Sequence, residues 1–92
     1  MRSAPSPVVA LNRAIAIGQR DGPERGMEEL QAIGHRERLS RYPFHAAALG
    51  EFELRRGHPS AAREHFQAAL GLARNRTERR FFEKRLESCG RA

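Results

Sequence analysis

Residues 44–73 read FHAAALGEFELRRGHPSAAREHFQAALGLA, and this stretch decides the fold. Apolar residues recur every three or four positions on both sides of Gly57-His58-Pro59, which is the period of an amphipathic helix. The triplet separates two helices, because glycine tolerates turn conformations and proline is favoured at the first position of a helix. A break this short makes the two helices antiparallel neighbours. The stretch therefore predicts a helical hairpin.

A second stretch, residues 7–34, has the same organisation. Its apolar residues have helical spacing from Pro7 to Arg20, and Asp21-Gly22-Pro23 then breaks the pattern before a second helix that ends at Gly34. The sequence thus predicts two copies of one unit, each made of a helix, a break with glycine and proline, and another helix.

The two copies are not in perfect register. The glycines of the two breaks are 35 residues apart, and at this offset Met27 corresponds to Ala62. Leu30 then falls one residue short of the position that corresponds to Phe66. A one-residue deletion in the first turn would explain the shift.

Two side chains are placed to cap helices. Ser6 precedes Pro7 as an N-cap, and Asn75 is an N-cap for a last helix in which Glu78 has the spacing of a capping box. Two hairpins leave apolar surface open at the end of the stack, so a further helix is needed to cover it. We expect the large apolar residues of the last helix to do so: Phe81, Phe82 and Leu86.

The composition agrees with an all-α domain. The chain has 92 residues, enough for one domain with a modest core, and β-branched residues are few. A single cysteine allows no internal disulfide, and no apolar run is long enough for a signal core or a membrane span. We therefore expect residues 1–92 to form one cytoplasmic domain with no contact to a membrane.

The second hairpin resembles one tetratricopeptide repeat. Leu49-Gly50 lies where that motif has its Leu-Gly pair, Gly57 lies at its turn, and the second helix carries its small–aromatic–small positions as Ala62, Phe66 and Ala69. The fold class expected is all-α, with about five helices: two antiparallel tetratricopeptide-like hairpins and a C-terminal capping helix.

Three segments together resemble a narrower family. They are SPVVALNRAIAI at residues 6–17, YPFHAAALGEFELRRG at residues 42–57 and NRTERRFFEKRL at residues 75–86. In this order they are similar to the C-terminal extension of a group of bacterial extracytoplasmic-function (ECF) RNA polymerase sigma factors. The resemblance implies a protein-interaction or regulatory domain that acts in transcription initiation. Its partners would be RNA polymerase or other regions of the same sigma factor. The promoter-binding regions of that family lie upstream and are not in this chain.

The resemblance to tetratricopeptide folds also implies a binding surface. In those folds the first helix of each pair lines a concave groove, which places five polar residues of this chain there: Asn12, Gln19, Arg20, Glu51 and Arg55. Asn12 has a second interpretation, in which its side chain ties its helix to a neighbouring loop. We expect charge reversal at Arg20 and Arg55 to weaken partner binding and to leave the fold intact.

The positive charge is concentrated at the C-terminal end. The net charge is +6, and residues 74–92 hold seven of the 17 basic residues but three of the 11 acidic ones. A basic patch is possible at Arg76, Arg79, Arg80, Lys84 and Arg85. Such a patch is either a solvated helix face or a surface for an acidic partner, nucleic acid included. The alternative functions are therefore a scaffold or dimerisation domain and a basic nucleic-acid-binding domain.

No pattern predicts catalysis. The four histidines lack the i, i+4 spacing of a zinc-binding helix, and no glycine-rich loop carries the lysine of a phosphate site. Arg85 lies one turn before Cys89 and would lower the pKa of its thiol, but no histidine lies near it in the sequence to act as a base. We expect no enzymatic activity, no metal and no cofactor.

Overall fold

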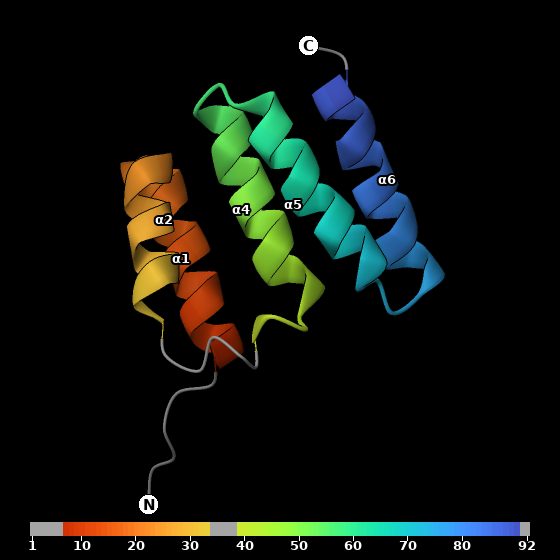
Figure 1. The fold of residues 1–92 in the computed structure, drawn as a ribbon. Coiled ribbons are helices and arrows are strands. Elements are labelled where there is room, and N and C mark those ends of the chain that lie inside the picture. Colours follow the sequence, from red (N-terminus) through yellow and green to blue (C-terminus); the bar gives the residue numbers. More distant parts are fainter. Residues whose placement is uncertain (1–6, 34–38, 91–92) are drawn as a thin grey trace, which may run out of the picture.

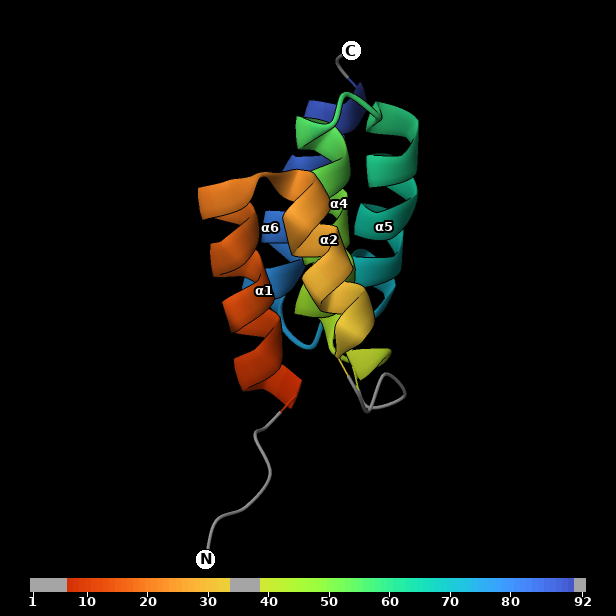
Figure 2. The same cartoon turned by 90° about the vertical axis from the view of Figure 1, so that its left-hand side faces the viewer.

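The protein is all-α in the computed structural model, which describes residues 7–33 and 39–90. Its helices are α1 (Pro7–Asp21), α2 (Pro23–Ala32), α4 (Pro43–Arg55), α5 (Pro59–Gly71) and α6 (Arg76–Gly90). Helices α1 and α2 form one antiparallel hairpin, α4 and α5 form a second, and α6 packs on the far side of α5 (Figure 1). Figure 2 looks along this stack and shows α1 and α6 on one side and α5 on the other. The predicted fold class is confirmed.

Both hairpins turn at a glycine that has a left-handed backbone. Gly22 has φ of 107° and Gly57 has φ of 84°, a region that residues with a side chain rarely adopt. Each glycine is followed by the proline that begins the next helix, directly in the first turn and after His58 in the second. The expected breaks are therefore present where the sequence placed them.

The end that we expected for the second helix lies two residues too late. Helix α2 ends at Ala32, and Ile33 is already extended, with φ of −70° and ψ of 130°. Gly34, at which we expected the end, lies outside the described residues, as does the proposed cap Ser6.

The register of the two hairpins is 36 residues, counted from Pro23 to Pro59. The first helices are offset by the same 36 residues, from Pro7 to Pro43, so the two units have equal length and the deletion expected in the first turn is wrong. The glycine of the second turn only lies one residue earlier in its unit than the glycine of the first. In this register Leu30 and Phe66 correspond, and both are buried. The pairing of Met27 with Ala62 is wrong, because buried Gly26 occupies that position and Met27 is half-buried beside it.

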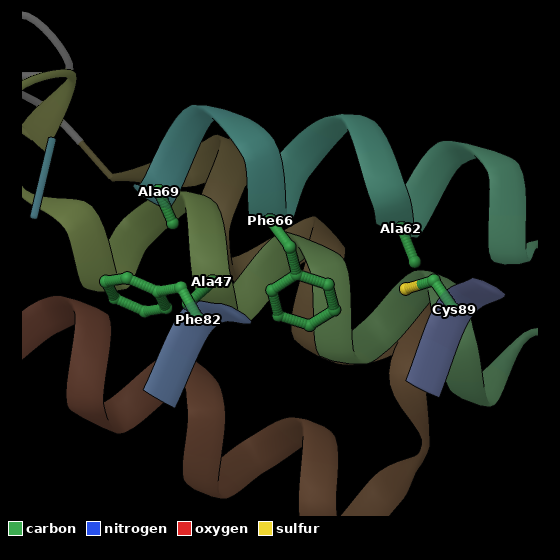
Figure 3. Close-up of a cluster of buried hydrophobic side chains, with 6 residues drawn as sticks. All are labelled: Ala47, Ala62, Phe66, Ala69, Phe82 and Cys89. Carbon is green, nitrogen blue, oxygen red and sulfur yellow. The ribbon is translucent and has the colours of Figure 1, made fainter. Parts of the chain in front are cut away.

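A first core cluster joins α4, α5 and α6. Figure 3 shows Phe66 of α5 between Ala62 and Ala69, with Phe82 and Cys89 of α6 on the side facing it. The Phe66 ring also lies over Gly50 of α4, where a Cβ atom would come within 2.8 Å of the ring. Helix α6 thus covers the second hairpin as expected, through Phe82 and the partly buried Leu86, whereas Phe81 remains 45% exposed.

A second cluster joins the two hairpins, and Phe52 lies at its centre. The ring is 2% exposed and ends on the crossing of α1 and α2, which touch through two glycines, Gly18 and Gly26. A Cβ atom on Gly26 would lie 2.5 Å from the Phe52 ring and 2.8 Å from the Gly18 Cα. Only glycine allows this close approach of two helices under an aromatic ring.

Helix α6 begins with a cap that also fixes it to α4. The Glu78 amide donates to Asn75 Oδ1 at 2.8 Å, as expected for an N-cap. The return bond of a capping box is displaced by one residue, because the Glu78 carboxylate accepts from the Arg74 backbone N–H at 2.9 Å. The Arg74 guanidinium donates to the same carboxylate at 2.6 Å and lies over the Tyr42 ring, which precedes α4.

We expect Gly26→Ala to lower the free energy of unfolding by about 2 kcal/mol, because the new methyl group would overlap Phe52 and the backbone of α1. Urea unfolding followed by circular dichroism measures the loss. Gly71→Ala is the control, since nothing lies within 4 Å of a Cβ atom there. The double variant Gly26→Ala, Phe52→Leu should lose less free energy of unfolding than the sum of the losses of the two single variants. Simple additivity of the two losses would contradict the proposed overlap.

The pH dependence of stability tests the α6 cap. Hydrogen bonds from the Arg74 guanidinium and then its backbone N–H hold the pKa of Glu78 below its usual value. The carboxylate therefore stabilises the fold above the usual glutamate pKa of about 4.3, and this contribution is lost as the pH falls through the folded pKa. We expect Glu78→Gln to lower stability at neutral pH and to reduce the loss of stability in acid. Glu83→Gln, at an exposed position of α6, should change neither.

Candidate protein-binding groove

The first helices of the two hairpins and α6 surround a groove. All three run in the same direction, with their N-terminal ends at the lower side of Figure 1. The groove has a volume of about 360 Å³ and is lined by nine residues of these helices: Ile15, Gln19, Phe44, Ala47, Ala48, Glu51, Phe52, Arg55 and Phe81. Its walls therefore come from helices that are distant in sequence.

Aromatic rings form the wall near the N-terminal ends of α4 and α6. The ring centroid of the buried Phe82 is 5.4 Å from that of Phe44 and 5.5 Å from that of Phe81. These are normal distances for tilted and edge-on aromatic pairs. Phe81 is one of two large apolar residues exposed in the described part of the chain; the other is Val9. An exposed ring beside a buried aromatic cluster is the type of anchor that partner proteins use.

The opposite end of the groove is polar. Arg55 donates through one Nη1 hydrogen to the Gly18 carbonyl at 3.1 Å, which ties the end of α4 to α1. Gln19 of α1 lies exposed on the same wall. The groove thus has an apolar end and an end with hydrogen-bond donors.

Glu51 is neutralised by a cation from α6. Arg85 Nη2 donates to Glu51 Oε1 at 2.9 Å, and Arg85 Nε lies 2.7 Å from Oε2. The Arg85 guanidinium also lies 5.7 Å from the centre of the Phe66 ring, as a cation–π contact. This pair joins α4 to α6 beside the groove and removes the one negative charge on its lining.

The structure brings three of the five predicted groove residues together. Gln19, Glu51 and Arg55 line the groove, whereas Asn12 and Arg20 do not. Asn12 is exposed and makes no hydrogen bond to any residue that the structure describes. Arg20 pairs with its neighbour Asp21 at 3.0 Å on the surface.

Arg55 is also a structural residue. Reversal of its charge would break the bond to the Gly18 carbonyl, so we expect this variant to lose some stability as well as binding. Sequence reasoning missed Phe81 as a groove residue and assigned it to the core. A signal was present, because adjacent residues of a helix point about 100° apart, so Phe81 and Phe82 are not expected to be equally buried.

The basic patch is smaller than the sequence suggested. Arg85 belongs to the pair with Glu51, and Arg74 is occupied by Glu78. The four other cations of α6 are exposed and form no ion pair within the described residues: Arg76, Arg79, Arg80 and Lys84. Two glutamates of the same helix, Glu83 and Glu87, are also exposed. The exposed face of α6 therefore carries mixed charge.

Cys89 is not an activated thiol. The side chain is 1% exposed, and burial raises the pKa of the thiol despite the nearby Arg63 and Arg85. Arg85 acts to lower the pKa of the thiol, as expected, but desolvation of the thiolate outweighs the attraction of the two cations, so the net shift is upward. In residues 7–33 and 39–90, no three side chains of His, Cys, Asp or Glu are grouped as a metal site would require.

The comparisons with known proteins give one informative relative. The chain is 37% identical over 86 residues to an uncharacterized protein of Rhizobium meliloti. The alignment covers 94% of this chain but 20% of the relative, so the chain spans about a fifth of the length of the curated protein it matches. No family model matches the chain, and no solved structure does. None of the described helices is long and apolar enough to cross a bilayer.

Proposed function

We propose that this chain is a protein-binding module and that the groove between α1, α4 and α6 holds a segment of its partner. The exposed Phe81 carries this proposal. Burial of a ring of this size stabilises a protein by about 2 kcal/mol, so leaving it 45% exposed is a cost that a partner can recover. The ring borders a groove whose remaining walls are rigid helices packed on two cores.

We further propose that the module acts in transcription initiation as part of an ECF-type sigma factor. The support is the resemblance of residues 6–17, 42–57 and 75–86 to the C-terminal extension of those factors. The relative from Rhizobium meliloti carries a similar region as a fifth of its length, which agrees with a module inside a longer protein. In this proposal the groove binds RNA polymerase or the promoter-binding regions of the same sigma factor.

Direct binding of DNA is the weaker alternative. Arg74 and Arg85 are occupied by carboxylates of their own domain, and two glutamates interrupt the remaining cations of α6. A nucleic-acid surface needs several unpaired cations in one face, because its affinity comes from neutralising successive phosphates.

Titration of this chain against purified RNA polymerase core, and separately against the promoter-binding regions of the cognate sigma factor, tests the proposal. We expect one of the two to bind, and Phe81→Ala to weaken binding by about tenfold, the effect of losing roughly 1.4 kcal/mol at an aromatic anchor. Val9→Ala is the matched control, because Val9 is 53% exposed but lies away from the groove.

Two results would contradict the proposal. Binding that is equally insensitive to Phe81→Ala and Val9→Ala would exclude the groove as the binding site. Failure of both polymerase and the promoter-binding regions to bind would exclude the role in transcription.

A further inference from the structure

The two ends of the groove differ in the chemistry of their side chains. Phe44 lies in the first turn of α4, and Phe81 lies in the first half of α6. At the other end, Gln19 lies in the last turn of α1 and Arg55 in the last turn of α4. These helices run in the same direction (Figure 1). The aromatic residues therefore collect at one end of the groove and the polar side chains at the other. An occupant that fits must carry matching chemistry along its length.

The polar end carries the one charged group on the lining that no carboxylate pairs, the guanidinium of Arg55. A guanidinium has five N–H donors, and Arg55 uses one of them on the Gly18 carbonyl, so the others remain for a ligand. Glu51 is the one acidic residue on the lining, and Arg85 neutralises it.

We propose, on the basis of the protein-binding function above, that the occupant is an acidic–aromatic peptide segment, with apolar side chains against Phe44 and Phe81 and a carboxylate at Arg55 and Gln19. A guanidinium can hold a carboxylate through two parallel hydrogen bonds, which fixes the orientation of the segment. A basic segment would bring its cations to Arg55 with no free carboxylate on the lining to receive them. A purely apolar segment would leave the donors of Arg55 and Gln19 unsatisfied beneath it.

Three synthetic peptides provide the probes. They share one apolar sequence with two phenylalanines and differ in the flanking positions, which carry Asp, Asn or Lys. Fluorescence anisotropy against the full 92-residue chain gives their affinities. We expect the Asp peptide to bind at least tenfold more tightly than the Asn peptide, the Lys peptide to bind most weakly, and added salt to reduce the difference.

Two variants of α1 add one negative charge each. They distinguish the effect of a charge on the groove lining from the effect of the net charge of the protein. Gln19→Glu places a carboxylate on the groove lining and should weaken the Asp peptide about tenfold, whereas Asn12→Asp lies outside the lining and should change its affinity less than twofold. Both positions are exposed, so the fold should persist in both variants, as circular dichroism checks.

The outcomes distinguish this inference from the function on which it rests. If Phe81→Ala weakens all three peptides equally and their affinities are the same, the groove is a binding site but the acidic occupant is wrong. If the Asp peptide binds and neither Phe81→Ala nor Gln19→Glu affects it, the groove itself is wrong. Absence of binding by the Asp peptide also overturns the inference.

Discussion

The packing of Phe52 on two glycines joins the halves of this protein. Helices α1 and α2 touch through Gly18 and Gly26, and the ring of Phe52 from α4 closes over that crossing. This contact places the first hairpin against the second without a long interface between α1 and α4. Arg55, one turn later on α4, reinforces it by donating to the Gly18 carbonyl. The angle at which the two hairpins meet, and therefore the groove, depends on these few residues.

Helix α4 is shared by every part of the structure. Gly50 receives the Phe66 ring of α5, Phe52 packs on the first hairpin, and Glu51 between them pairs with Arg85 of α6. Since successive residues of a helix point about 100° apart, these three neighbours reach three different partners. The groove-facing residues Phe44 and Arg55 extend the face of Glu51 along the helix. The same helix thus contributes to both cores and to the surface that we propose for binding.

The electrostatics of the chain follow from which charges are paired inside it. A net charge of +6 suggests a basic surface, yet Arg74 and Arg85 hold helices together through Glu78 and Glu51. Exposed pairs such as Arg20–Asp21 contribute little to stability, because water and salt screen them. Arg85 pairs with Glu51 at the edge of the groove and neutralises its carboxylate. Arg55 is then the one unpaired ion on the lining.

The sequence by itself determined the described helices, their turns and the Asn75 cap. Helical periodicity, prolines at first positions and glycines at turns act within a few residues, so Pro7 and Pro59 begin helices where expected. The resemblance to tetratricopeptide folds also placed Gln19, Glu51 and Arg55 on the groove. Tertiary structure decided the rest. Which of Phe81 and Phe82 is buried, which arginines are paired and whether Cys89 is activated depend on the neighbours that α6 meets after docking, and those neighbours come from distant segments of the chain.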